Sequence, residues 1–290
     1  MTLRPGAPAR TRTPRAAAVA VLGLVAALAG CAGTGPTLGR GPAEIVREAV
    51  VSTAAAGPSH ATVTGRTAVM GQEIPLDGGG VVDPLHQAAD LTLQVPSLGA
   101  VRVVFTGGTL DAQLPPAASG LIGMFSGGKS WVSVDVNRLA QSGYGAPLGA
   151  LGVGTTDNPA QQLGYLKAIS DTTRLVGPEQ IDGVDTTHYA GAVDLDKVPA
   201  ADDPSTKPGV DRLKAQLGSS LLPVDVWVDG GGKLRRVGQT VSVPATPGAP
   251  AGAPTTSTTT TITFSDVGNA PEVVPPPADQ VSDISSLLPG

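Results

Sequence analysis

Ala89-Asp-Leu-Thr-Leu-Gln-Val95 and Val101-Arg-Val-Val-Phe-Thr106 alternate apolar with polar residues, and these two stretches decide the fold class of the chain. The same alternation occurs in His60-Ala-Thr-Val-Thr-Gly-Arg66 and in Ser130-Trp-Val-Ser-Val-Asp135. Successive side chains of a β-strand point to opposite faces of a sheet, so a period of two residues predicts strands with one buried face.

Glycine-rich clusters separate many of these segments: Asp77-Gly-Gly-Gly80, Gly107-Gly108 and Gly127-Gly128. Glycine reaches backbone conformations that other residues avoid, so such clusters are typical of turns. Several short alternating strands with turns between them predict an antiparallel sheet that is covered on one face.

The pattern changes to a helical period in three places. A helix is predicted over residues 42–56, where Pro42 suits a first turn and Gly57-Pro58 ends the helix. A second helix begins at Asn158-Pro159, and a third covers residues 208–218. Their apolar stripes consist of Ile45, Val46, Ala49, Val50 and Thr53 in the first, Leu163, Leu166 and Ile169 in the second, and Val210, Leu213 and Leu217 in the third.

Further strands are predicted between and after these helices. They cover residues 173–176, 186–194, 222–228, 233–243 and 256–264. A Pro/Gly/Ala-rich connection, 244–254, joins the last two and is typical of a long mobile hairpin loop. The tail with Pro275-Pro-Pro277 is expected to be extended, and either lies over the sheet or hangs free.

The order of elements predicts an α+β fold: a single curved antiparallel β-sheet, a half-barrel, with helices packed on its concave face. No repeat of 20–50 residues is visible, so solenoids and propellers are not expected. The predicted organisation has four parts: a signal peptide over 1–30, a flexible tether over 31–41, one domain over 42–268 and a Pro-rich tail over 269–290.

The N-terminus carries a targeting signal. Arg4, Arg10, Arg12 and Arg15 precede an apolar run of about 14 residues, which is too short for a membrane span of roughly 20. Leu28-Ala29-Gly30-Cys31 closes the run and resembles a bacterial lipobox. The resemblance implies that Cys31 receives a diacylglyceryl group on its sulfur and that the chain is cut before it. The two acyl chains would anchor the protein to the outer face of the cell membrane. An ordinary signal peptide with an incidental cysteine is the alternative.

The charge balance excludes one class of partner. Removing residues 1–30 takes away four arginines and no acid, which changes the formal net charge from −5 to −9. A net-acidic chain without a basic run has no general attraction to nucleic acid. Because Cys31 is the one cysteine, a disulfide within the chain is excluded, and an ordinary apolar core must stabilise the fold.

A family resemblance rests on residues of the second half. They are Gly183-Val-Asp-Thr-Thr-His-Tyr-Ala-Gly-Ala-Val-Asp-Leu-Asp196, Leu222-Pro-Val-Asp-Val-Trp-Val-Asp229, Lys233-Leu-Arg-Arg-Val237 and Phe264-Ser-Asp-Val-Gly268. With the lipobox and Lys129-Ser-Trp-Val132, this arrangement resembles the actinobacterial LppX/LprG-type lipoproteins over residues 42–285. The resemblance implies a LolA-like half-barrel around helices and an apolar cavity for an acylated lipid or glycolipid.

The expected function is that of a non-enzymatic envelope lipoprotein that binds or carries a lipid and needs no cofactor. The alternatives are an adaptor for an unknown protein partner and an enzyme or metal-dependent module. Alternation alone predicts the residues that line the cavity: Leu91, Leu93, Val101, Val103, Val226 and Val241. A lipid cavity must be about as apolar as a bilayer, because an acyl chain gains about 0.8 kcal/mol per buried CH₂.

Two further sequence patterns suggest nucleotide binding and metal binding, and neither is strong. Residues 123–130 match the nucleotide-binding P-loop pattern G-x-x-x-x-G-K-S, but a strand pattern follows where a P-loop needs a helix, so we expect a glycine turn that enters a strand. The histidines at 60, 86 and 188 are scattered and lack metal-ligand spacing, although His188 lies near Asp185, Asp194 and Asp196 in sequence. No metal site is expected. Asp83, Asp90 and Asp111 are expected in or beside turns.

Overall fold

The computed structural model describes residues 39–69, 72–95, 99–113, 115, 126–141, 159–202, 207–243 and 256–287. The chain divides into two compact units, Met1–Pro36 and Thr37–Gly290, and all described residues belong to the second. The expected signal peptide, the lipobox with Cys31 and the 244–254 connection lie outside the described residues. They therefore stay predictions.

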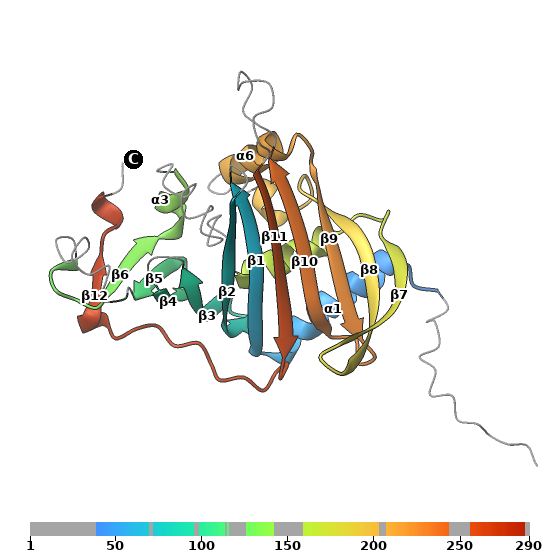
Figure 1. Cartoon of the computed structure of the whole chain (residues 1–290), viewed down its shortest axis with the longest axis horizontal. Coiled ribbons are helices and arrows are strands. Elements are labelled where there is room, and N and C mark those ends of the chain that lie inside the picture. Colours follow the sequence, from blue (N-terminus) through green and yellow to red (C-terminus); the bar gives the residue numbers. More distant parts are fainter. Residues whose placement is uncertain are drawn as a thin grey trace, which may run out of the picture. The chain divides into compact units, whose positions relative to one another are not determined.

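Strands dominate the second unit, and Figure 1 shows their arrangement. The strands are β1 (Ser59–Val69), β2 (Gln72–Asp83), β3 (Ala88–Val95), β4 (Gly99–Thr106), β5 (Thr109–Gln113), β6 (Trp131–Asp135), β7 (Arg174–Ile181), β8 (Val184–Asp194), β9 (Leu221–Asp229), β10 (Leu234–Val243), β11 (Thr256–Ser265) and β12 (Val281–Asp283). The helices are α1 (Pro42–Ala56), α3 (Val136–Gln141), α5 (Pro159–Tyr165) and α6 (Lys207–Leu217), with 3₁₀ turns η3 (Leu166–Ala168), η4 (Pro199–Ala201), η5 (Ala278–Gln280) and η6 (Ser285–Leu287).

All twelve described strands form one sheet in the order β12-β6-β5-β4-β3-β2-β1-β11-β10-β9-β8-β7. Every neighbouring pair is antiparallel except β12 and β6, which run parallel. The sheet does not close, because β12 and β7 lie at opposite ends of the order. The predicted fold class, an α+β half-barrel built on one curved sheet, is confirmed.

One face of the sheet, here called the inner face, is apolar and carries the core. Val63, Leu91, Val226 and Phe264 project from it and are each less than 7% exposed. Figure 1 shows α1 and α5 on one side of the sheet, and α1 contacts β7, β8, β9 and β10 while α5 contacts β2 and β3. The helices therefore cover the face that the strand alternation made apolar.

The predicted helices agree with the structure. Helix α1 covers the predicted residues, and Ala43, Val46, Ala49, Val50 and Thr53 are its buried side chains. In the second helical segment, Leu163, Leu166 and Ile169 are at most 3% exposed. The third helix buries Val210 and packs Leu213 and Leu217 against the core.

One predicted turn is wrong. Asp77-Gly-Gly-Gly80 lies inside strand β2, where Gly78 pairs with Val63 on one side and Leu93 on the other. A Cβ atom on Gly80 would lie 2.0 Å from the carbonyl oxygen of Asp90. These glycines therefore permit a close approach of neighbouring strands, which a sequence shows in the same way as a turn. The Gly107-Gly108 turn between β4 and β5 is confirmed.

The strand pattern also missed parts of the sheet. Strands β2 and β5 and helix α3 were not predicted, and β7 extends five residues beyond its predicted end at Val176, to Ile181. Asp90 and Asp111 lie within β3 and β5 rather than in turns, and Asp111 is buried.

The tail neither lies over the sheet nor hangs free, because β12 adds a parallel strand to the edge of β6. Lys129 Nζ donates to the carbonyl of Val281 over 2.7 Å, and the backbone N–H of Asp135 donates to Ser285 Oγ over 2.9 Å. Figure 1 shows the segment after β11 running to this distant edge. Such pairing between distant residues leaves no local sequence signal.

Candidate functional site

The residues predicted to line a cavity all lie on the inner face. Leu91, Leu93, Val101 and Val103 are 8% exposed or less and Val226 is fully buried, whereas Val241 is partly buried against the same core. Their inward orientation follows from the alternation of the strands. That they contact a lipid stays a prediction.

The structure divides these six residues into two groups. Leu91 pairs with Val103 and Leu93 with Val101 across β3 and β4, so four of them form one patch. Val226 and Val241 lie on β9 and β10, and β2, β1 and β11 separate them from that patch. Alternation could not reveal this separation, because it gives the face of a residue and not its strand neighbours.

Between the two groups, β2 presents both glycines and aliphatic side chains to the inner face, because Leu76 and Val82 are buried in the core beside Gly78 and Gly80. Gly78 pairs with Val63 and Leu93, and Gly80 pairs with Ala61 and Leu91. Helix α5 contacts β2 and β3 in this region. Val63 of β1 and Ile262 and Phe264 of β11 lie between the two groups and join them into one buried cluster.

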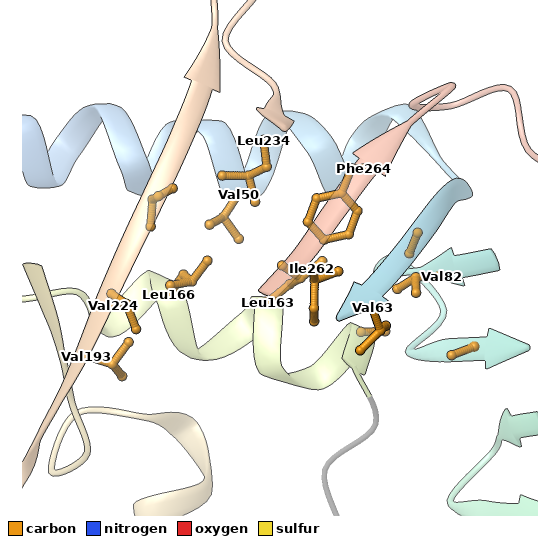
Figure 2. Close-up of a cluster of buried hydrophobic side chains, with 14 of the residues drawn as sticks. Val50, Val63, Val82, Leu163, Leu166, Val193, Val224, Leu234, Ile262 and Phe264 are labelled. Carbon is orange, nitrogen blue, oxygen red and sulfur yellow. The ribbon is translucent and has the colours of Figure 1, made fainter. Parts of the chain in front are cut away.

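Aliphatic side chains from the helices meet the inner face. Figure 2 shows Val50 of α1 and Leu163 of α5 on the side of Ile262 and Phe264 of β11, and Leu166 nearer to Val224 of β9. All six side chains are at most 7% exposed and belong to one cluster. The space between sheet and helices is therefore bounded by hydrocarbon on both sides.

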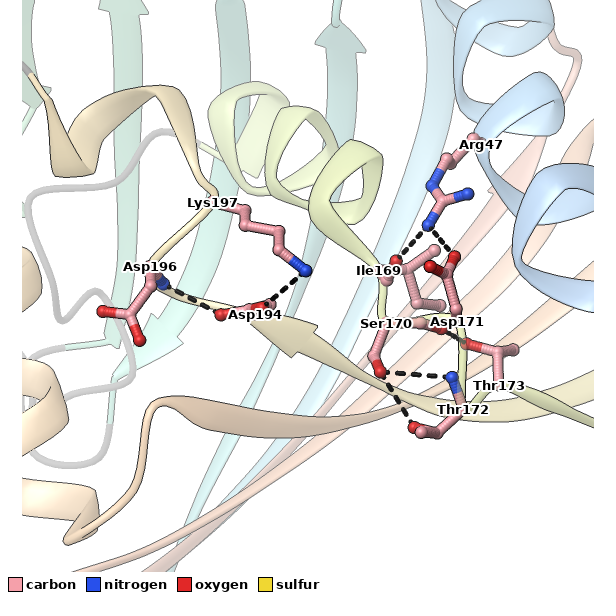
Figure 3. Close-up of polar contacts among 9 residues, drawn as sticks. All are labelled: Arg47, Ile169, Ser170, Asp171, Thr172, Thr173, Asp194, Asp196 and Lys197. Carbon is pink, nitrogen blue, oxygen red and sulfur yellow. Dashed lines mark hydrogen bonds and ion pairs between the residues drawn. The ribbon is translucent and has the colours of Figure 1, made fainter.

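A polar link fixes α1 beside the start of β7 (Figure 3). Arg47 donates to the backbone carbonyl of Ile169 over 2.7 Å and to the carboxylate of Asp171 over 2.6 Å. This guanidinium lowers the pKa of Asp171 below its usual value of 3.8. Two segments that are distant in sequence are thus joined at the rim of the inner face.

His188 has partners other than those its sequence neighbours suggested. On the opposite face of the sheet, here called the outer face, its ring stacks on Trp227 with centroids 4.2 Å apart. Its Nε2 lies 2.7 Å from Asp225 Oδ1, and Trp227 Nε1 donates to Glu179 Oε2 over 2.7 Å.

None of the three aspartates near His188 in sequence accounts for its contacts. Asp185 accepts a bond from Gln180, Asp194 pairs with Lys197 (Figure 3), and Asp196 pairs with Lys214. Hydrogen bonds from Lys214 and Ser220 lower the pKa of Asp196. The period of two does place Trp227 and Asp225 on one face of β9, but no sequence signal pairs them with His188.

Two other side chains with shifted pKa values lie in a turn and in a pair of neighbouring strands. Asp83 is buried at the end of β2, accepts the backbone N–H of Leu85, and raises the pKa of the exposed His86 through a 2.6 Å bond. Asp90 binds Arg102 with both carboxylate oxygens and raises the pKa of the guanidinium. Each pKa shift follows from the hydrogen bond to the neighbouring carboxylate.

The described end of the P-loop-like segment, residues 126–130, is a turn that enters a strand, as expected. Gly127 and Gly128 have φ angles of 58° and 81° and lead into β6. Lys129 binds the tail, as described above, and Ser130 Oγ lies 3.2 Å from Gln280 Oε1. Both residues that would contact phosphate and metal in a P-loop thus hold the C-terminal strand.

The described residues contain neither a metal-binding cluster nor a membrane-spanning helix. In that part of the chain, no group of three or more His, Cys, Asp or Glu side chains could hold a metal ion. No described helix is long and apolar enough to cross a membrane. That the chain is not an enzyme and needs no cofactor stays a prediction.

Comparison of the sequence with known proteins gives one relative of unknown activity. No family model matches the chain. An uncharacterised 31.2 kDa protein of Streptomyces griseus, from the rplA-rplJ intergenic region, is 26% identical over 216 residues. The match spans 66% of this chain and 66% of that protein, just under two thirds of its length.

Solved structures of three proteins are similar to most of the chain. LprF from Mycobacterium bovis has a TM-score of 0.43 at 15% identity and covers 81% of this chain and 96% of its own. For the Mycobacterium tuberculosis lipoprotein LppX, the TM-score is 0.41 at 17% identity, over 80% of this chain and 98% of that one. A LolA superfamily protein of Nitrosomonas europaea has a TM-score of 0.30 at 11% identity, over 83% and 96%.

TM-scores below 0.5 do not assign a function to the chain. LppX and LprF, together with a LolA superfamily protein, are among the solved structures that this chain resembles.

Proposed function

We propose that this chain is a lipid-anchored protein of the cell envelope that binds the acyl chains of a lipid or glycolipid between its sheet and its helices. The observation that carries the proposal is the continuous aliphatic inner face, opposed by aliphatic side chains of α1 and α5. Hydrocarbon on both sides would make transfer of an acyl chain from a bilayer nearly neutral in free energy, which permits loading and release.

Helix α5 covers the inner face near β2 and β3. At Gly78 the side chain of Leu93 lies over the backbone of β2, since an added Cβ would be 2.7 Å from Leu93 Cδ2. Separation of α5 from these strands would open a space lined by Leu91 and Leu93. The contact of α5 with these strands makes it the candidate gate.

Native mass spectrometry tests lipid binding. The Cys31→Ser chain, purified from an actinobacterial host, is expected to carry an added mass that organic solvent extracts. Val103→Trp should reduce the fraction of protein that carries lipid several-fold. Val103 is 3% exposed on the inner face, and the added ring would occupy the space proposed for the acyl chain. The matched control is Thr92→Trp, an exposed outer-face position on the neighbouring strand β3.

Absence of any bound lipid in the unsubstituted chain would overturn the proposal. Equal lipid content in the Val103→Trp, Leu91→Trp and unsubstituted chains would overturn the assignment of these lining residues. Circular dichroism of each variant separates loss of lipid from loss of fold.

Anchoring through Cys31 has its own test. We expect Cys31→Ala to move the protein from the membrane fraction to the soluble fraction, because no acyl group can then be attached to that sulfur. Retention of the variant in the membrane would show another anchor.

A protein-binding adaptor is the second candidate, and one observation favours it. Strand β7 lies at an edge of the sheet and exposes Leu175 and Val176, which are 57% and 47% accessible. Edge strands can pair with an extended segment of a partner. A lipid-free mass together with cross-links through β7 in intact cells would favour this function.

A further inference from the structure

The outer face of the three central strands holds a hollow that the proposed lipid-binding function does not use. It has a volume of about 590 Å³ and is lined by residues of β1, β2 and β11. Pockets for small ligands commonly have volumes of about 300–1,000 Å³. The hollow is large enough for a ligand, and its lining differs from that of the inner face.

The register of the strands builds the lining as a grid of three rows. Thr64 of β1 lies between Thr261 of β11 and Asp77 of β2. Arg66 lies between Thr259 and Pro75 in the next row. Since directly paired residues share a face and residues two apart do too, all these side chains project to the outer side.

The third row completes the grid with smaller side chains. Ala68 of β1 lies between Ser257 of β11 and Glu73 of β2. Ser257, Thr259, Thr261 and Thr64 together supply four hydroxyl groups to the lining. Thr259 and Thr261 of the Thr-rich strand β11 thus face the hollow, whereas Thr258 and Thr260 face the inner side.

The charges of the lining argue against an anionic ligand. Glu73 and Asp77 contribute two carboxylates against the one guanidinium of Arg66, which lies 3.5 Å from Glu73. Within the described part of the chain, no cation pairs with Asp77. A phosphate or carboxylate group would meet an unpaired negative charge and lose its hydration without compensation.

Apolar and peptide ligands are also poorly matched. Ala68 and Pro75 are the two apolar side chains in the lining, and neither is large. Strands β1, β2 and β11 have neighbours on both sides, so their backbone groups cannot accept an added strand. The groups offered to a ligand are hydroxyls, carboxylate oxygens and small hydrocarbon surfaces.

We propose that this hollow binds a neutral glycan. Sugar hydroxyls both donate and accept hydrogen bonds, as do the hydroxyls of Thr64, Thr259 and Thr261. The carboxylate of Asp77 accepts two donors from adjacent sugar hydroxyls, and the ring of Pro75 contacts the C–H face of a sugar. Lipid binding on the inner face and glycan binding on the outer face would be independent properties of the two sides of one sheet.

The experiment measures binding of short neutral oligosaccharides of glucose, mannose, arabinose and N-acetylglucosamine to the Cys31→Ser chain by NMR chemical-shift titration. Shifts are expected at β1, β2 and β11. Replacing Thr64 and Thr261 together by Val removes two hydroxyls with little change of shape or strand propensity, and should weaken binding about ten-fold or more. Asp77→Asn should weaken it by a similar factor.

The matched control is Thr62→Val, because Thr62 is exposed on the outer face of β1 but lies outside the hollow. This variant should bind as the unsubstituted chain does. Binding of no neutral oligosaccharide, tighter binding of an anionic one, or equal loss of affinity in Thr62→Val would overturn the proposal. Retention of co-purified lipid in the Thr64/Thr261 variant would show that only the outer face was changed.

Discussion

The inner and outer faces of β1, β2 and β11 are built from alternate residues of the same strands, yet they differ in almost every property. Inward residues such as Val63, Leu76 and Phe264 are buried in one hydrocarbon cluster. Outward residues such as Thr64, Asp77 and Thr259 are exposed or partly exposed around a polar hollow. Burial against helices stabilises one face, and the other face is left for surface interactions.

The difference shows where substitutions have large effects. An inward side chain loses contacts on every side when it is shortened, and the cavity left behind adds to the cost. An outward hydroxyl exchanges its bonds with water and contributes little to stability. Stability and ligand binding can therefore be changed separately on this sheet, and three predictions test this separation.

The largest effect is expected for Gly80→Val. Any side chain on Gly80 would place its Cβ 2.0 Å from the carbonyl oxygen of Asp90, so β2 and β3 would have to separate. We expect a loss of at least about 3 kcal/mol in the free energy of unfolding, or no folded protein. Urea denaturation, monitored by circular dichroism, measures this loss in the free energy of unfolding.

The control for this variant is Gly108→Ala in the β4–β5 turn. Its φ of +84° also disfavours a side chain, but no atom lies within 4 Å of the added Cβ. Only the backbone cost of about 1–2 kcal/mol is expected there. If the two variants were equally stable, close approach of the strands would not be the reason for the glycine in β2.

The next prediction compares Phe264→Ala with Thr261→Ala on the same strand. Phe264 is 3% exposed within the core, so its truncation should cost about 3–5 kcal/mol. Thr261 faces the outer hollow, and its truncation should change the free energy of unfolding by less than about 0.5 kcal/mol. Thermal unfolding of both variants checks the difference, and similar losses would contradict the separation of the faces.

The smallest effect concerns pH and the link at the rim of the inner face. Arg47 lowers the pKa of Asp171 in the folded chain below its usual 3.8, so the unfolded state binds more protons near that pH. The stabilisation by this pair is therefore present above about pH 4, and is lost as the pH falls through the lowered pKa. Asp171→Asn should make the acid-induced loss of stability slightly less steep.

Acid titration of the free energy of unfolding measures this last change. Asp182→Asn, in the β7–β8 turn, is the control, since Asp182 has no ion pair among the described residues. A greater effect of Asp182→Asn than of Asp171→Asn would contradict the assignment.

Much of the fold could be predicted because its signals are local. The stripe of Val46, Ala49, Val50 and Thr53 gave the bounds of α1 and its buried face. Alternation placed Leu91, Val103 and Val226 on the apolar face of the sheet. The period of the hydrophobic pattern is a property of neighbouring residues, so the sequence alone determined element type and facing.

Three features were decided by contacts between distant residues. The sequence predicted a turn at the glycines of β2, because a turn and a close approach of two strands both require glycine. The partners of His188 lie 39 and 37 residues away on β9, and those of β12 lie about 150 residues away on β6. None of these pairings has a periodic signal.

By itself, then, the sequence determined the α+β class, three of the four described α-helices, most strands and the apolar face, since each follows from spacing along the chain. Only the tertiary structure decided the strand order, the register that sets Thr64 between Thr261 and Asp77, and the division of the predicted lining residues into two groups. The physical reason is that a strand satisfies its backbone with whichever partner the packed core brings beside it, and that choice depends on the whole chain.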